Sequence, residues 1–322
     1  MANKLFFRSA LISTILSYLL IFVGGLVRVS GSGLGCPDWP KCFGRWVPPT
    51  SIEQIPAHID PTAFNIVLAW IEYGNRMLGV IVGFSIIIMT VIAVLYFRNN
   101  SKILYSALWS LFLVGANGGL GAIVVSSVLN PFIVSLHMIL ALFLVSVLSY
   151  GTIESYKLIN LNKFSNILLS KKISISLIAL WGLIVIEILL GTGIRTNIEL
   201  IAIDNPLYSK GQLLDALNSY KYLHSVLGFS LLFLSIYLCY LFRDDFLGLS
   251  KQLIYFIFGM ILFQIFLGEL MIFFELPQLT RLFHTWGSSW LVGIIIILYN
   301  TCLLYTSPSP RDTERSRMPS SA

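Results

Sequence analysis

Two stretches of the sequence match each other and decide the fold: NGGLGAIVVSSVLNPFIVSLH at residues 117–137 and QIFLGELMIFFELPQLTRLFH at residues 264–284. Each begins with a side-chain amide, continues with Leu-Gly at the same offset, contains a proline near a hairpin and ends in histidine. Landmarks that keep their spacing indicate an internal duplication. The sequence therefore predicts two related units in tandem.

Two further pairs of stretches extend this repeat. EYGNRMLG at 72–79 matches KYLHSVLG at 221–228, and VGGLVR, which ends at Arg28, matches LLGTGIR, which ends at Arg195. In the second unit the fourth residue of KYLHSVLG is His224, whereas Asn75 takes that place in the first unit. The repeat thus covers most of the chain, and it differs at a residue that matters for metal binding.

The composition is that of an integral membrane protein. Of the 322 residues, 57% are hydrophobic and 11% are charged, and the mean hydropathy is +0.84. No soluble domain hides that much apolar surface. The apolar runs lack the two-residue alternation of a membrane barrel. We therefore predict an all-α membrane protein with eight transmembrane helices, arranged as two tandem pseudo-symmetric four-helix bundles. The runs begin near Ser9, Asn65, Ile103, Pro131, Ile173, Tyr220, Leu253 and Trp286.

The basic residues predict the orientation in the membrane. Lysines and arginines gather before the first run and in alternate short loops, which places those segments and the N-terminus in the cytoplasm. Two long loops, roughly 29–64 and 195–220, then lie outside. The net charge of +6 follows from this topology and does not indicate a nucleic-acid surface. The expected location is a bacterial cell (inner) membrane.

The repeat also predicts the division of the chain. The first four-helix unit spans 1–152, a cytoplasmic linker spans 153–172, and the second unit spans 173–300. Residues 301–322 are rich in Ser, Pro and Arg and unlike the preceding sequence. We expect this tail to be non-native and exclude it from the functional reasoning.

Histidines at matched depth predict a haem site in the second unit. His224 lies about one turn into its apolar run. His284 lies seven residues after Pro277 of the hairpin, which corresponds to roughly 10 Å at the rise per residue of an α-helix. Two imidazoles that face each other across a bundle suit the axial positions of a haem iron. The alternative is that each histidine only bonds a neighbouring helix. In the first unit His137 matches His284, but Asn75 replaces the second histidine.

Other polar residues near these positions have two interpretations each. Glu72 lies one turn before Asn75, where a carboxylate is costly unless it is paired, for example with Arg76. Arg28 and Arg195 end matched helices, where they could bind haem propionates or anchor the helices at the lipid headgroups. These alternatives remain open at this point.

A pair of cysteines lies in the first outer loop. Cys36 and Cys42 occur in GSGLGCPDWPKCFGRW, on the side of the membrane predicted to be oxidising, where two nearby cysteines are typical of a disulfide. The sequence has no C-x-x-C-H motif for covalent haem attachment. A metal site is possible in principle, but the cysteines lack nearby histidine partners.

Taken together, GGLVRVSGSGLGCPDWPKCFG, EYGNRMLG, GGLGAIVVSSVLNPFIVSLHM and LLGTGIRT resemble the haem A synthase family across residues 10–300. The resemblance implies an eight-helix enzyme that oxidises the methyl group of haem O to the formyl group of haem A, for haem–copper terminal oxidases. It implies a haem b held by His224 and His284, a substrate-haem ligand at His137 and a functional glutamate at Glu72. The paired outer-loop cysteines are also a family feature.

The chain departs from the family pattern at three positions. Asn75 stands where the pattern has a second histidine, and an amide is a poor iron ligand. Asn117 and Glu187 stand where glutamine is expected. We assign Asn75, Arg76 and Asn117 to the substrate site, with Glu72 and His137 as catalytic residues.

Two other classes of protein compete with the enzyme. A b-type cytochrome would pass electrons in the membrane without converting a haem, and a transporter would also have parallel repeats. The glycine- and cysteine-rich loop favours the enzyme, and a transporter gives no reason for histidines at matched depth. The expected partners are haem O, haem O synthase, the assembly of terminal oxidases and the lipid membrane. The oligomeric state stays open, a homo-oligomer included.

Overall fold

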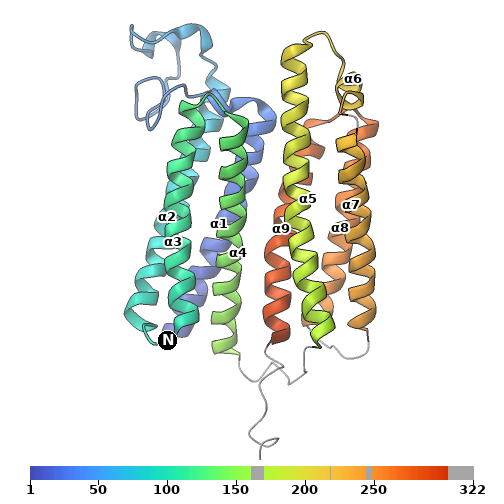
Figure 1. Cartoon of the computed structure of the whole chain (residues 1–322). Coiled ribbons are helices and arrows are strands. Elements are labelled where there is room, and N and C mark those ends of the chain that lie inside the picture. The colour runs from blue at the N-terminus through green and yellow to red at the C-terminus, as the bar shows by residue number, and fades with distance from the viewer. Residues whose placement is uncertain (161–169, 218, 244–248, 304–322) are drawn as a thin grey trace, which may run out of the picture.

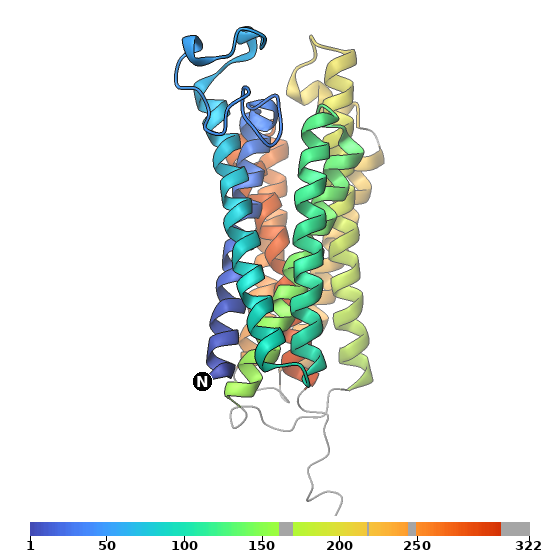
Figure 2. The same ribbon diagram turned by 90° about the vertical axis from the view of Figure 1, so that its left-hand side faces the viewer.

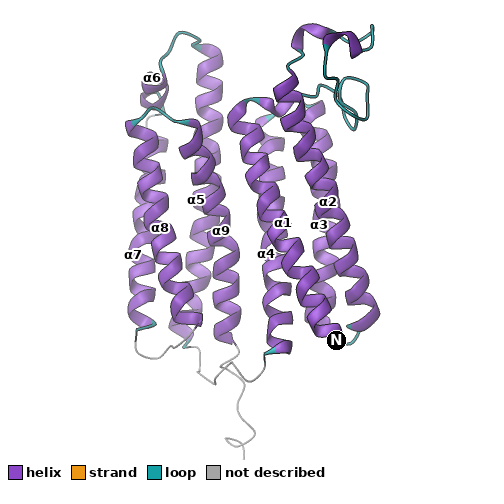
Figure 3. Cartoon of the chain, turned by 180° about the vertical axis from the view of Figure 1, so that it is seen from behind, coloured by secondary structure: helices purple, strands orange, loops and turns teal. Residues whose placement is uncertain are grey.

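The structure, a computed structural model, describes residues 1–160, 170–217, 219–243 and 249–303. The regular elements in these ranges are helices, without a β-strand (Figure 3). Eight of the described helices are long and apolar enough to cross a membrane, which confirms the prediction of an all-α membrane protein with eight spans.

Helices α1–α4 pack side by side (Figure 1). Asn65, Asn100 and Asn130 each cap the helix that follows, because their side-chain oxygens accept hydrogen bonds from backbone N–H groups of the first turn. The bounds are Ala2–Ser30 for α1, Ile66–Tyr96 for α2, Ser101–Ser126 for α3 and Pro131–Ile159 for α4.

The remaining long helices form the other side of the molecule (Figure 1). A short helix, α6, lies between the end of α5 and the start of α7 and begins with a capping box formed by Ser209 and Gln212. The bounds are Lys171–Asp204 for α5, Lys210–Asp215 for α6, Ser219–Leu241 for α7, Leu249–Phe273 for α8 and Gln278–Leu303 for α9.

Several helices extend beyond the apolar runs that predict them. Helix α1 begins seven residues before Ser9, α9 begins at Gln278 and not near Trp286, and α5 continues past Arg195 to Asp204. Hydropathy marks the part of a helix that lies in lipid, whereas backbone hydrogen bonds continue into the polar flanks. Helix α4 likewise enters the predicted linker. Residues 161–169 of that linker, and all of the predicted tail after residue 303, lie outside the described residues.

Each group of four long helices has its own cluster of buried apolar side chains. One cluster runs from Phe6 to Leu148. The other runs from Leu142 to Cys302, and its members lie on α5 and α7–α9 except Leu142 and Phe242, which directly follows α7. Aromatic side chains of α1 and α9 join the groups: Tyr18 stacks on Trp290, and the Trp286 indole N–H donates to the Tyr18 carbonyl at 2.9 Å. The division between two units therefore has a physical counterpart in the packing, while their pseudo-symmetry stays a prediction.

The two hairpins that precede the repeated histidines share an uncommon backbone. Val128 and Leu129 have φ of 52° and 60°, and Glu275 and Leu276 have φ of 53° and 62°. Bulky residues rarely adopt positive φ. Both pairs stand at the same offset from the histidine that follows, nine and eight residues before it. This agreement supports the tandem repeat from which the site is built.

Candidate functional site

His224 on α7 and His284 on α9 face each other within the second group of helices. Their ring centroids lie 6.3 Å apart and the ring planes differ by 62°. A metal–imidazole bond is about 2 Å long and the ring centre lies about 1 Å behind the nitrogen, so two axial imidazoles have centroids about 6 Å apart. The two residues therefore fit the axial ligand set of a haem.

Glycines on the neighbouring helices leave room for these rings. A Cβ on Gly191 would lie 3.2 Å from Cε1 of His224, and one on Gly268 would lie 3.9 Å from Cε1 of His284. The approach at Gly191 is tighter than an ordinary contact, so this glycine lets α5 come close to His224, whereas at Gly268 a Cβ would only touch the ring of His284.

The first group repeats this arrangement at the matching positions. A Cβ on Gly121 would lie 3.7 Å from Cε1 of His137, which resembles the approach of Gly268 to His284 in the second group. A Cβ on Gly24 would lie 3.8 Å from Oδ1 of Asn75, so the amide takes the position of His224. Asparagine is shorter than histidine and lacks its ring nitrogen donors. Only one imidazole is thus present at this site within the described residues.

Buried polar atoms without a partner among the described residues gather at these same positions. In the first group they include Oδ1 of Asn75 and Oδ1 of Asn117. In the second group they include the side-chain amide of Gln264, which matches Asn117 in the repeat. Native proteins satisfy most buried polar groups, so such a cluster marks where a bound group completes the interactions. Both positions suit a large ligand that brings its own polar atoms.

Glu72 and Arg76 anchor the outer loop to α2. The Cys36 N–H donates to Oε2 of Glu72 at 2.8 Å, and Oε1 of Glu72 lies 2.5 Å from Nη2 of Arg76. Arg76 also donates to the backbone carbonyls of Asp38 at 2.7 Å and Lys41 at 2.8 Å. The predicted pair at i and i+4 is confirmed. Its donors and acceptors are engaged with the loop, so the pair holds that loop in place.

The predicted disulfide between Cys36 and Cys42 is present, with the Cα atoms 4.6 Å apart. Both cysteines are fully buried, and they pack with Phe43 and Ala69 in a small cluster at the outer end of α2. The loop that contains them lies over the C-terminal end of α1 and the N-terminal end of α2 (Figure 2). The disulfide and the Glu72–Arg76 pair therefore fix the same segment of chain.

The arginines of the repeat meet between the two groups of helices. Arg195 donates to the backbone carbonyl of Arg28 at 3.3 Å and pairs with Glu199 at 2.8 Å. Arg28 contacts the sulfur of Met138, which is the neighbour of His137. Sequence reasoning missed a third cation, Arg281, whose charge interacts with Arg195 and whose Nε is buried without a partner among the described residues. Its spacing of three residues from His284, one helical turn, was the available signal.

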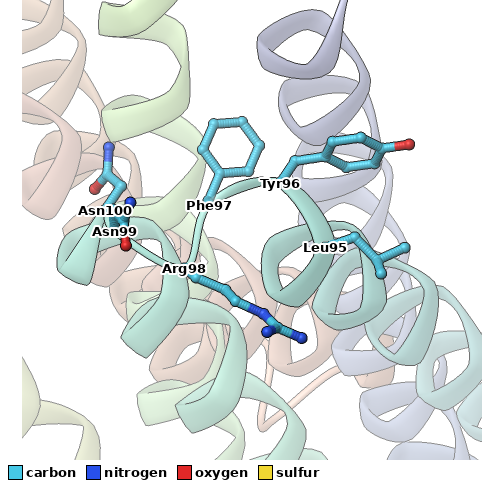
Figure 4. Close-up of a pocket in the computed structure, with 6 residues that line it drawn as sticks. All are labelled: Leu95, Tyr96, Phe97, Arg98, Asn99 and Asn100. Carbon is cyan, nitrogen blue, oxygen red and sulfur yellow. The ribbon is translucent and has the colours of Figure 1, made fainter.

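A surface pocket lies elsewhere and does not belong to this site. It has a volume of about 370 Å³ and is lined by the end of α2 and the turn that leads to α3 (Figure 4), namely Leu95, Tyr96, Phe97, Arg98, Asn99 and Asn100. That turn is at the opposite end of the bundle from the outer loop (Figure 1). Six consecutive residues at the end of one helix and in the turn after it form an indentation of the surface, not an interhelical ligand site.

Comparisons with known proteins agree with the geometry. The family COX15-CtaA, described as cytochrome oxidase assembly protein, matches residues 8–296. A "Heme A synthase" of Geobacillus thermodenitrificans is 32% identical over 136 residues, which are 42% of this chain and 38% of that protein. A "Heme A synthase" of Pelagibacter ubique is 29% identical over 195 residues, 54% of this chain and 55% of that protein. The matched part thus spans about two fifths to about half of these relatives. Since the family match covers most of the chain, the protein is a member of the COX15-CtaA family of cytochrome oxidase assembly proteins.

Proposed function

We propose that this protein is a haem A synthase, a membrane oxidoreductase that oxidises the methyl group of haem O to the formyl group of haem A. The family and the names of two relatives support this activity. The observation that carries it is the pair of matched positions in one chain: two imidazoles 6.3 Å apart in the second group, and the imidazole of His137 beside an amide in the first. One position would take a resident haem and the other a substrate haem.

The second unit, residues 173–300, holds haem b through His224 and His284. When bound, haem b would supply one-electron redox chemistry, with His224 and His284 as its protein ligands. Arg28 and Arg195 bind the propionates, since guanidinium groups match carboxylates in shape and charge.

The first unit, residues 1–152, holds the substrate haem. His137 would be its protein ligand, and Asn75, at the position that matches His224, would supply no second imidazole. Asn117, which matches Gln264, offers a free amide oxygen at the same level. A substrate must enter and leave, so weaker ligation in this unit suits its task better than the two imidazoles of the second unit.

Glu72 and Arg76 serve this first site from its outer end. Glu72 is 4% exposed, and both its oxygens are engaged by Cys36 and Arg76. A general acid–base role for Glu72 therefore requires its bond to the Cys36 N–H to open. While that hydrogen bond is formed, the Glu72–Arg76 pair keeps the disulfide loop over the site and so excludes water from the site.

The membrane topology completes the proposal. Eight helices and the family make this an integral membrane protein. We place it in a bacterial inner membrane with a cytoplasmic N-terminus, because basic residues concentrate at that end of the bundle. Haem O synthase would supply the substrate, and the product would enter terminal oxidase assembly. A homo-oligomer is compatible with this arrangement.

Co-expression with a haem O synthase tests the proposed function. Membranes from such cells should contain haem A with the wild-type chain, and haem O without haem A with His137→Ala. Haem b without haem A in the wild-type membranes would support the alternative of a b-type cytochrome and contradict the enzyme. The Glu53→Gln variant, which alters an exposed acid in the outer loop, serves as the matched control and should form haem A normally.

A further inference from the structure

Glu187 is a carboxylate within the membrane-spanning helix α5, where an ionisable group is costly and usually functional. Its Oε1 lies 3.1 Å from Nδ1 of His224, and both side chains are largely buried. Its Oε2 is buried without a partner among the described residues. The side chain is therefore directed at the ring nitrogen of His224 that does not face an iron when Nε2 is the ligand.

The helix that carries Glu187 also forms the wall behind the imidazole. Gly191 follows one turn later on the same face, and a Cβ there would lie 3.2 Å from Cε1 of His224. On α7, a Cβ on Gly228 would lie 3.4 Å from Oε1 of Glu187. Gly191 thus leaves room for the imidazole ring of His224, and Gly228 leaves room for the carboxylate of Glu187.

The first unit has no carboxylate at the matching position. Glu187 precedes Arg195 by eight residues, and the residue eight positions before Arg28 is Leu20. A packing role alone would be served by leucine, as it is in the first unit. The carboxylate is therefore present in the unit that has two imidazoles, and leucine replaces it in the unit that has one.

We propose that Glu187 is a positioning residue for His224, which deepens the proposed function because it rests on His224 as a haem b ligand. The carboxylate accepts the Nδ1–H hydrogen bond, so Nε2 carries the lone pair that binds iron. In the structure Nδ1 and Oε1 are within hydrogen-bond distance, but the N–H is not aimed at the oxygen.

This contact has a consequence for the redox potential. A carboxylate that accepts the imidazole N–H increases the basicity of the ligand, which stabilises the ferric iron more than the ferrous iron. The midpoint potential of haem b is therefore lower than it would be with a neutral partner. A glutamine at residue 187 would still orient the ring but would supply less negative charge.

Redox titration of the purified protein tests this role. Glu187→Gln and Glu187→Leu should retain haem b, with midpoint potentials shifted upward and the larger shift in the leucine variant. The low-spin electron paramagnetic resonance g values should change in the same order. Glu269→Gln, which removes an exposed acid from α8 of the same unit, should change neither quantity.

An unchanged midpoint potential and unchanged g values in Glu187→Gln would overturn the inference, as would an equal shift in Glu269→Gln. If the leucine variant purifies without haem, the isosteric glutamine variant carries the test. His224→Ala separates this inference from the proposed function: retention of a normal low-spin haem b in that variant contradicts the ligand assignment itself, whatever Glu187 does.

Discussion

Replacement of Glu72 by glutamine should release the outer loop from α2. Glutamine keeps one acceptor oxygen but places an NH2 group where the second oxygen was. Either the Cys36 N–H or the Arg76 guanidinium, at 2.8 Å and 2.5 Å from Glu72, then faces another donor. The variant therefore loses one charge-assisted hydrogen bond and the charge that compensates Arg76.

The contacts set the magnitude of this effect. A hydrogen bond to a charged group contributes about 1.5–3 kcal/mol, and removal of one partner of a buried ion pair costs about 3–5 kcal/mol. Arg76 keeps its bonds to the carbonyls of Asp38 and Lys41, which limits the loss to the lower end. We expect the Glu72→Gln substitution to destabilise the anchored loop by about 3 kcal/mol. This corresponds to an increase of about a hundredfold in the equilibrium constant for opening the loop.

Limited trypsin digestion measures that equilibrium, because Lys41 and Arg45 lie in the loop and are exposed. When opening is fast relative to cleavage, the cleavage rate follows the open population. Cleavage after Arg45 should be about a hundredfold faster in Glu72→Gln and unchanged in the control Glu53→Gln. Equal rates in the Glu72→Gln variant and the wild type would refute the anchoring role.

Three other substitutions test separate parts of the account. His224→Ala should purify without low-spin haem b, as measured by its absorption spectrum, because one axial imidazole is gone. Asn75→His should keep at least part of the haem A formation, whereas His137→Ala should abolish it, as judged by chromatography of extracted haems. Complete loss of haem A formation in Asn75→His would contradict a substrate site that tolerates either residue. Gly35→Ala should lower the thermal stability, since its Cβ would lie 2.3 Å from the Leu68 carbonyl oxygen, an overlap that costs about 1–3 kcal/mol; an unchanged melting temperature would argue against this packing.

The sequence predicts the features that depend on local patterns. Apolar runs predict the eight spans because lipid demands them, and a spacing of four residues predicts the pair of Glu72 and Arg76. The proximity of Cys36 and Cys42 likewise predicts their disulfide. Each of these features involves residues that are close in the chain or a composition that covers a whole helix.

Features that join distant segments could not be predicted in this way. The hydrogen bonds from Arg76 to backbone carbonyls of the outer loop span 35 to 40 residues. No sequence pattern predicts which backbone carbonyl accepts such a bond. The contact of Glu187 with His224 joins α5 to α7. The position of Arg281 near Arg195 depends on how α9 packs beside α5. Such contacts follow from the packing of whole helices, which the sequence pattern leaves undetermined.

The central claim is that the first unit converts a haem while the second unit retains one. Incubation of the purified protein with haem O under aerobic conditions and with a reductant, followed by mass spectrometry of the extracted haems over time, tests it most directly. Haem O should gain one oxygen and lose two hydrogens to become haem A, while the amount of haem b stays constant. Haem O that binds stoichiometrically but keeps its mass throughout, beside an intact haem b, would contradict the account.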